Sequence, residues 1–316
     1  MGAGSLVSVD ILTFGEPMFE LAEVETDGAT AYVPGFGGDA SNVAVAAARQ
    51  GAHVGVFTRV GRDTFGDRFL ALWADEGIDA STVQQDAEAP TGTYLISYGP
   101  AGHEFSYYRK GSAASLVRPA DVPIEAIASA RMLHLSGISQ AISDGACDAS
   151  FAAIEVAKNH GVRVSYDTNL RLKLWPLARA RAIIMATAGM SDVCLPSLED
   201  GRQLTGKDDP DAIADAFLSA GAKLVVLKLG ADGALVADGR SRERVPAFPV
   251  EPVDATGAGD TFDGAFLAKT IAGATPVDAA TYANAAAALS TLGHGAVVPI
   301  PRAEVVERFL KERGWG

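Results

Sequence analysis

Short β-branched hydrophobic runs alternate with Ala-rich amphipathic segments along most of the chain. The runs predict buried strands: VSVDILTFG, VGVFTRVG, RMLHLSG, VRVSYD and KLVVLKLG (7–15, 54–61, 131–137, 162–167 and 223–230). The amphipathic segments predict helices that mostly end on Gly: DASNVAVAAARQG, FGDRFLALWADEG, DGACDASFAAIEVAKNHG and DDPDAIADAFLSAG (39–51, 65–77, 144–161 and 208–221). This alternation predicts a mainly parallel sheet covered by helices on both faces.

Two segments depart from this rhythm. Residues 19–36 are polar and strand-like, and TGTYLISYGPAGHEFSYYRKG (91–111) predicts a hairpin that turns at residues 99–102. Hydrophobic and polar residues alternate along this hairpin, which is typical of strands with one buried and one solvated face. These segments could form a small separate sheet, a lid over the main domain, or they could extend the edge of the main sheet. We expect a single domain over residues 1–316, with the lid inserted at about 19–36 and 91–113.

Composition limits the classes of protein and of binding partner that fit this chain. The 316 residues are 48% hydrophobic and 21% charged, so a large core can be buried. A net charge of -13, with no run of Lys or Arg to offset it, excludes nucleic acid and acidic membrane surfaces as expected partners. No apolar segment is long enough to span a bilayer, and Met1 to Ser5 read as a loose end without an export signal. Cys147 and Cys194 lie far apart, which is typical of a reducing cytoplasm.

Several familiar functional motifs do not fit this sequence. GAGDTF resembles a dinucleotide fingerprint, but Phe262 occupies its third glycine position. GRQLTGKD resembles a P-loop, but Asp208 replaces the Ser or Thr that would bind magnesium, and a helix C-cap at Gly206 explains the stretch better. The five histidines have no metal-ligand spacing, and there is no G-x-S-x-G motif.

The most informative stretch is the glycine-rich turn Thr256-Gly257-Ala258-Gly259, directly before Asp260 at the start of a predicted helix. Such a turn presents backbone N–H groups and the positive end of the helix dipole to an anion. We expect Asp260 to be ionised and a poor base in the free protein, yet able to accept a hydroxyl proton late, as the oxygen attacks phosphorus. This combination indicates phosphoryl transfer to an alcohol. The alternative is an N-cap aspartate on an ordinary helix.

Two longer motifs closely resemble the signatures of the ribokinase-like (PfkB) carbohydrate kinases. They are GFGGDASNVAVAAARQGAHVGVFTRVGRDTFGDRFL (35–70) and VDATGAGDTFDGAFLA (253–268), and the resemblance spans nearly the whole chain. It implies a three-layer α/β/α domain with a β-sheet lid, and ATP with Mg²⁺. It also implies that Asp260 is the base and that Gly257, Ala258 and Gly259 form an anion hole. Gly38 and Asn42 would line the sugar site.

Four shorter stretches resemble the 2-keto-3-deoxygluconate kinases of that family: GEPMFEL (15–21), FSYYRKGSAAS (105–115), LHLSGIS (133–139) and YDTNLRLKLW (166–175). The resemblance implies that Tyr107, Arg109 and Arg171 contact an acid sugar, and that Tyr94 also reaches it. Arginine suits this role because it grips a planar carboxylate with two hydrogen bonds. Without the resemblance, YYRK reads as a hairpin with packed Tyr side chains and solvated charges, and NLRLKLW as the start of a helix.

The resemblance also implies an ATP site. LKLGADGALV (227–236) resembles the nucleotide loop of the family, which places Lys228, Gly230 and Gly233 beside ATP, Asn284 near adenine and Asn169 near the phosphates. The family's N-x-x-E element, which helps to place magnesium, is S-x-x-D here. The resemblance implies that Ser197 lies beside the nucleotide and that Asp200 holds a metal-bound water. Some members also bind a monovalent cation such as K⁺ beside the anion-hole loop. On spacing alone, Lys228 could equally be a surface charge at a strand end.

Three functions follow from these features. The first is an ATP-dependent kinase that converts 2-keto-3-deoxygluconate, a small acid sugar, to its 6-phosphate. The second is a fructokinase or another neutral-sugar kinase of the family, because YDTNLRLKLWP also resembles fructokinases. The third is a non-catalytic sugar- or nucleotide-binding regulator, which need not keep Asp260 and the glycine turn. We also expect a homo-oligomer through the lid sheet, because an unpaired, partly apolar sheet invites a second subunit.

Overall fold

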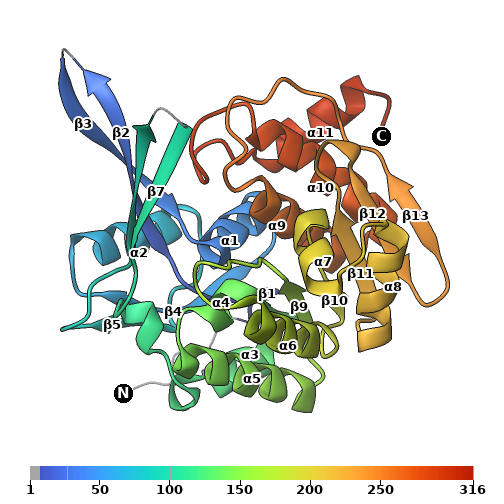
Figure 1. Ribbon diagram of the computed structural model, residues 1–316, viewed down its shortest axis with the longest axis horizontal. Helices are drawn as coiled ribbons and strands as arrows, with labels where there is room; N and C mark the ends of the chain where they lie inside the picture. The colour runs from blue at the N-terminus through green and yellow to red at the C-terminus, as the bar shows by residue number, and fades with distance from the viewer. Residues whose placement is uncertain (1–7, 27, 100–101, 316) are drawn as a thin grey trace.

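A long, mostly parallel sheet forms the centre of the computed structural model, which describes residues 8–26, 28–99 and 102–315 (Figure 1). Within those residues nine strands join in the order β13-β12-β11-β10-β9-β8-β1-β4-β5. In that order they are Arg242–Val245, Ala234–Asp238, Leu224–Lys228, Val193–Cys194, Arg163–Asp167, Met132–Ser136, Ile11–Phe14, Val54–Gly61 and Val83–Asp86. All neighbours are parallel except β11–β12 and β12–β13, so the predicted mainly parallel sheet is confirmed.

Helices cover both faces of this sheet. One layer contains α1 (Asp39–Arg49), α2 (Thr64–Asp75), α9 (Ala258–Ile271), α10 (Pro276–Ser290) and α11 (Ala303–Glu312). The other contains α3 (Ile124–Ser129), α4 (Gly137–Ala141), α5 (Asp144–Asn159), α6 (Leu177–Ala188), α7 (Leu198–Thr205) and α8 (Pro210–Ala220). Each layer closes its own hydrophobic core, and adjacent residues of one strand, such as Ile11 and Leu12, belong to opposite cores. The three-layer α/β/α prediction is confirmed. No helix in the described part of the chain is long and apolar enough to cross a membrane.

A second, smaller sheet rises from one end of the main body, at the upper left of Figure 1. Its order is β3-β2-β6-β7, with bounds Ala29–Gly37, Met18–Thr26, Thr93–Gly99 and Gly102–Tyr108. It shares no strand with the main sheet, so the edge-extension alternative is wrong. The predicted hairpin turn includes residues 100 and 101, which lie outside the described residues.

The predicted elements match closely, with two local differences. Gly51, Gly77, Gly161 and Gly221 follow their helices with φ of 90°, 68°, 71° and 120°, and Gly206 ends α7 with φ 71°, as the C-cap interpretation requires. The first strand begins only at Ile11, later than the run that starts at residue 7. NLRLKLW is a loop rather than a helix start, because the next helix, α6, begins at Leu177 after Pro176.

Close packing of α1 against α9 brings the two long motifs together. A Cβ on Gly264 would lie 2.5 Å from the Ala46 Cβ and 2.6 Å from the Val43 carbonyl oxygen, so only glycine allows this approach. The starts of both helices consequently meet at the carboxyl ends of the parallel strands, which is where ligands bind in open α/β sheets.

Candidate active site

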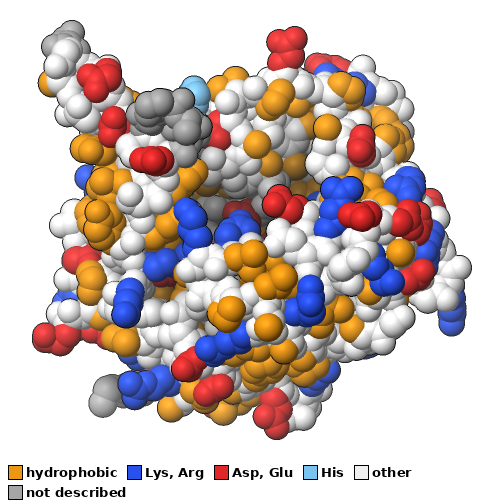
Figure 2. Space-filling model, in the orientation of Figure 1, with side chains coloured by type: hydrophobic (Ala, Val, Ile, Leu, Met, Phe, Trp, Pro, Cys, Tyr) orange, Lys and Arg blue, Asp and Glu red, His pale blue; other side chains and the backbone are white. Residues whose placement is uncertain are grey.

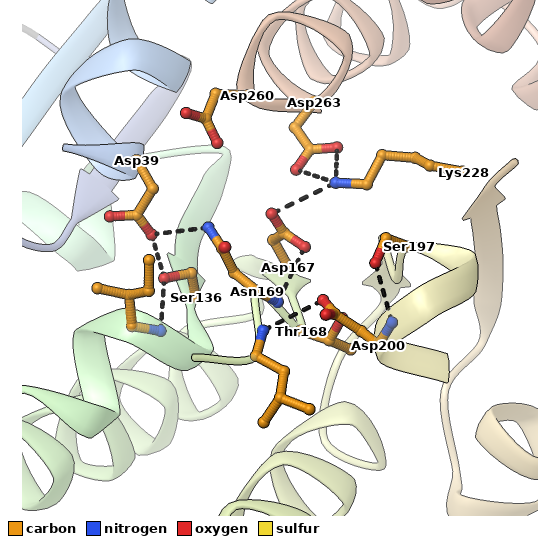
Figure 3. Close-up of polar contacts among 12 residues, drawn as sticks. Asp39, Ser136, Asp167, Thr168, Asn169, Ser197, Asp200, Lys228, Asp260 and Asp263 are labelled. Carbon is orange, nitrogen blue, oxygen red and sulfur yellow. Dashed lines mark hydrogen bonds and ion pairs between the residues drawn. The ribbon is translucent and has the colours of Figure 1, made fainter. Parts of the chain in front are cut away.

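Four buried or half-buried carboxylates and one ammonium gather where the strand ends and the helix starts converge (Figure 3). Asp39 begins α1, Asp167 ends β9, Asp260 and Asp263 lie in the first two turns of α9, and Lys228 ends β11. Sequence reasoning predicted Asp260 and Lys228 and missed the other three, whose proximity depends on tertiary packing.

Asp260 is poised for proton transfer rather than fixed as an anion. Its Oδ2 accepts a hydrogen bond from Asn42 Nδ2 at 2.8 Å. Removal of water from the carboxylate and the nearby charges of Asp39 and Asp167 raise the pKa of Asp260 to about 7, against the opposing effects of Asn42 and Lys228. The expectation of an ionised, poor base is therefore wrong, because it considered the helix dipole but neither the burial of the carboxylate nor the surrounding carboxylates. A carboxylate with this pKa is matched to general-base chemistry near neutral pH.

The glycine turn presents free backbone donors beside Asp260. Gly257 is the N-cap of α9 with φ 73°, in the left-handed region. Ala258 N–H donates to the Ala255 carbonyl at 3.2 Å. The N–H groups of Gly257, Gly259 and Asp260 have no hydrogen-bond partner among the described residues. These three donors, at the positive end of a 14-residue helix, form an anion site, whereas Ala258 contributes shape rather than a free donor.

The start of α1 forms the opposite wall of the site. Gly38 has φ 91°, and a Cβ there would lie 2.2 Å from the Glu16 carbonyl oxygen, so the chain can turn into α1 only with glycine. Asp39 accepts hydrogen bonds from Ser136 Oγ and, at 3.4 Å, from Asn169 Nδ2. Burial raises the pKa of Asp39. Its position inside the GGDASN motif was the only sequence signal that could have found it.

Lys228 is part of a buried ion cluster, so the surface-charge alternative is wrong. Its ammonium lies 2.9 and 3.0 Å from the Asp263 carboxylate oxygens and 3.3 Å from Asp167 Oδ2. The side chains of Lys228, Asp167 and Asp263 are 13%, 6% and 0% exposed. Burial alone would lower the pKa of Lys228, but the two carboxylates raise it above its usual value.

A cleft of about 510 Å³ opens beside this cluster. Six residues predicted from the nucleotide loop, the glycine turn and α10 share its lining: Lys228, Gly230, Gly233, Ala258, Gly259 and Asn284. Asn284 Nδ2 donates to the Val245 and Pro246 carbonyls at 3.2 and 3.1 Å. Phe248, Phe262 and neighbouring apolar side chains complete walls that suit a planar base.

The S-x-x-D element forms a helix cap. Ser197 Oγ accepts a hydrogen bond from Asp200 N at 3.1 Å and so begins α7. Asp200 Oδ2 accepts from Thr168 Oγ1 at 2.9 Å and from Leu170 N at 3.1 Å, whereas Oδ1 has no partner among the described residues. Asn169 lies beside these groups with φ 32°, and its side chain faces Asp39 rather than the cleft lining. Burial raises the pKa of Asp200.

The carboxylates of this site bear on metal binding. No three His, Cys, Asp or Glu side chains in the described part of the chain could hold a metal ion by themselves. Magnesium that arrives with nucleotide phosphates needs only one or two protein carboxylates and keeps several waters. The free Oδ1 of Asp200 meets that requirement, so the residues present fit a water-mediated magnesium contact.

Two of the predicted sugar contacts, one on β6 and one directly after β7, are each held by a buried glutamate. Tyr94 OH donates to Glu20 Oε2, and Arg109 donates to Glu16 Oε2 through Nε at 2.9 Å and also through Nη2. Tyr107 packs between them, with its ring 5.9 Å from the Tyr94 ring and 5.6 Å from the Arg109 guanidinium. Both glutamates were missed, although both lie in the GEPMFEL stretch.

Arg171 lies apart from this group. Its side chain is exposed, and Nη1 donates to the Leu170 carbonyl at 2.9 Å. No contact between described residues joins it to Arg109. Figure 2 shows a hollow in the middle of this face, between the small sheet and the main body, with Lys and Arg side chains along its rim.

The chain is similar to carbohydrate kinases in each comparison with known proteins. A family profile described as pfkB family carbohydrate kinase matches residues 7–303. The 2-dehydro-3-deoxygluconokinase of Bacillus subtilis (strain 168) is 34% identical over 311 residues, which cover 96% of this chain and 96% of that protein. The protein of the same name from Thermoproteus tenax is 37% identical over 313 residues, with 96% and 94% covered. Probable fructokinase-4 of Arabidopsis thaliana is 32% identical over 315 residues, with 95% and 96% covered.

Solved structures resemble the whole chain as well. A putative ribokinase II from E. coli in complex with ATP and Mg²⁺ has a TM-score of 0.89 at 26% identity, with 96% of this chain and 99% of that chain covered. A fructokinase from Vibrio cholerae O395 with fructose, ADP and calcium ion has a TM-score of 0.86 at 31% identity, with 96% and 100% covered. A double mutant of that fructokinase, with a TM-score of 0.86, 31% identity and 96% and 99% covered, contains a potassium ion.

Proposed function

This chain belongs to the pfkB family of carbohydrate kinases, and we propose that its substrate is 2-keto-3-deoxygluconate, whose C6 hydroxyl it phosphorylates with ATP. The observation that carries the chemistry is Asp260, with a pKa of about 7, beside three N–H groups that lack partners among the described residues. The choice of acid sugar is supported by the two 2-dehydro-3-deoxygluconokinases at 34% and 37% identity and by Arg109, directly after β7.

The Asp260 carboxylate accepts the proton of the C6 hydroxyl as the hydroxyl oxygen attacks the γ-phosphorus of ATP. The bond from that phosphorus to the β,γ-bridging oxygen breaks, and ADP leaves. Gly257, Gly259 and Asp260 N–H groups hydrogen-bond the equatorial oxygens of the migrating phosphoryl group. Each such donor in a dry site is worth about 3 kcal/mol of transition-state stabilisation. Magnesium, when bound, would neutralise the phosphate charge, with Asp200 holding one of its waters.

The remaining residues bind the two substrates. Gly38, Asn42, Tyr94, Tyr107, Arg109 and Arg171 are proposed to surround the sugar. Lys228, Gly230, Gly233 and Asn284 are proposed to line the nucleotide site, with Asn169 and Ser197 nearer the phosphates. A monovalent cation such as K⁺ beside the glycine turn stays a prediction; Asp254, which accepts hydrogen bonds from Thr256 and Gly295, supplies negative charge there. Rates in potassium and sodium salts test it.

Fructose is the second candidate substrate. It is favoured by probable fructokinase-4 of Arabidopsis thaliana at 32% identity and by the Vibrio cholerae fructokinase structure, which contains fructose. ATP consumption with a panel of sugars decides between them: kcat/KM should be highest for 2-keto-3-deoxygluconate, and a higher value for fructose would refute the proposal. The non-catalytic alternative is not supported for a member of a kinase family.

The small sheet is also proposed to join subunits in a homo-oligomer. Tyr32 and Val33 on β3 are 46% and 51% exposed, and Tyr107 and Tyr108 on β7 are 44% and 65% exposed. Neighbours on a strand point to opposite faces, so both faces of the small sheet expose apolar area, and a second copy could cover one of them. Light scattering coupled to size exclusion tests this proposal, and a monomer at micromolar concentration would refute it. We further propose a cytoplasmic location, which cell fractionation tests.

A further inference from the structure

A buried glutamate holds the arginine proposed to bind the sugar acid. Glu16 lies in the connection between β1 and β2, and its side chain is 0% exposed. Its Oε2 accepts both Nε, at 2.9 Å, and Nη2 of Arg109, while Oε1 accepts Ser112 Oγ at 3.1 Å. Both carboxylate oxygens are thus engaged by the segment that follows β7, and Glu16 ties this end of the small sheet to the main body.

This contact determines which edge of the guanidinium is free. Arginine has five N–H donors in a rigid plane, and a carboxylate normally binds one edge of that plane. In Arg109 the edge formed by Nε and Nη2 faces Glu16, whereas Nη1 has no partner among the described residues. The Tyr107 ring, 5.6 Å from the guanidinium, restricts the plane further. Arg109 therefore presents a fixed edge that includes Nη1.

Charge alone does not explain this arrangement. A glutamate beside Arg109 cancels much of its positive charge, which weakens general attraction for an acidic ligand. What remains is direction, because the contact with Glu16 holds the free N–H donors of Arg109 in one place. Glu20 holds Tyr94 OH in the same way, so one chain segment supports two of the predicted sugar contacts.

We propose that Glu16 is a positioning residue that turns the free edge of Arg109 toward the carboxylate of the sugar acid. The inference rests on the proposed function, because it concerns the carboxylate of an acid sugar.

Two conservative variants separate position from charge. Glu16→Gln keeps the reach and one acceptor oxygen but removes the charge, whereas Glu16→Asp keeps the charge and shortens the reach by one CH₂. We expect Glu16→Asp to raise KM for 2-keto-3-deoxygluconate by about tenfold or more, the scale of one hydrogen bond to a charged group. We expect Glu16→Gln to stay within about threefold of the wild type, because the orientation of Arg109 survives. In both variants kcat and KM for ATP should change little.

Arg49 and Glu76 provide a matched control. Arg49 Nε and Nη2 also donate to one carboxylate oxygen of Glu76, at 3.1 and 2.7 Å, with side chains 12% and 7% exposed. Glu76→Asp and Glu76→Gln should leave KM for the sugar unchanged, whatever they do to stability. A change in that KM similar to the change in the Glu16 variants would mean that general loss of packing is responsible, and would overturn the inference.

The outcomes also distinguish this inference from the proposed function. If the wild-type enzyme does not phosphorylate 2-keto-3-deoxygluconate, the proposed function fails, and the inference fails with it. If the wild-type enzyme does so but Glu16→Gln is impaired as much as Glu16→Asp, or neither variant changes KM, only the positioning role fails.

Discussion

The side-chain amide of Asn42 lies 2.8 Å from the carboxylate of Asp260, although 218 residues separate them. The contact exists because α1 and α9 pack closely at Gly264, which places both helix starts at the same edge of the sheet. Two distant motifs thereby form one site, in which an amide donor touches the proposed base.

Asp260→Ala should abolish turnover while sugar binding persists. Removal of a general base typically reduces kcat by about 10²–10⁴-fold, whereas the proposed sugar contacts lie on other residues. Steady-state rates and calorimetric titration of the sugar measure the two effects. Asp208→Asn, on a side chain 97% exposed, serves as the control. An active Asp260→Ala enzyme would contradict the base assignment.

Asn42→Ala should move the acid limb of the kcat/KM profile to higher pH. Burial and the charge of Asp39 raise the pKa of Asp260, and the hydrogen bond from Asn42 partly offsets them by stabilising the charged form, which gives a net value of about 7. Without this donor the carboxylate keeps its proton to a higher pH, so the enzyme reaches full activity only at a higher pH. A profile measured between pH 5 and 9 checks this, and a shift to lower pH would show that Asn42 acts differently.

Asp260→Asn should be more stable than the wild type at pH 8. The folded pKa of about 7 lies above the ordinary value of 3.8, so the folded protein binds the proton more tightly, and stability decreases as pH rises from about 4 to 7. An uncharged side chain removes that penalty, which we expect to be about 1–3 kcal/mol after screening by solvent. Denaturant unfolding at pH 8 and pH 5 tests this, because the difference between the variants should shrink at the lower pH.

Arg109→Ala should erase the preference for an acid sugar. The ratio of kcat/KM for 2-keto-3-deoxygluconate to that for fructose should decrease by tenfold or more, because hydrogen bonds to charged groups contribute about 1.5–3 kcal/mol. Arg171→Ala, which alters an exposed side chain that donates to its neighbour's carbonyl, gives the comparison. A ratio that Arg109→Ala leaves unchanged and Arg171→Ala reduces would place the carboxylate at Arg171.

The sequence predicted what depends on local pattern. Alternating strands and helices, the separate segments around 19–36 and 91–111, and the glycine turn before Asp260 are all legible from spacing. Asp39, Asp167 and Asp263 were missed because each looks like an ordinary helix or strand-end residue until the fold brings them around one site. The raised pKa of Asp260 was missed for the same reason, since it arises from burial in the assembled site and from neighbouring charges on α1 and β9.

Lys228→Met should destabilise the protein strongly, and a second substitution should recover part of the loss. Lys228 compensates Asp263, whose side chain is fully buried, so its removal leaves an unpaired carboxylate and should cost about 3–5 kcal/mol. Lys228→Met combined with Asp263→Asn removes that charge and should be more stable than Lys228→Met alone. Lys223 gives a matched control next to the other end of β11: its ammonium lies 2.6 Å from Asp192, but its side chain is 77% exposed, so Lys223→Met should cost less than about 1 kcal/mol. Denaturant unfolding of the four proteins decides the matter, and equal losses from Lys228→Met and Lys223→Met would show that burial of the cluster contributes nothing.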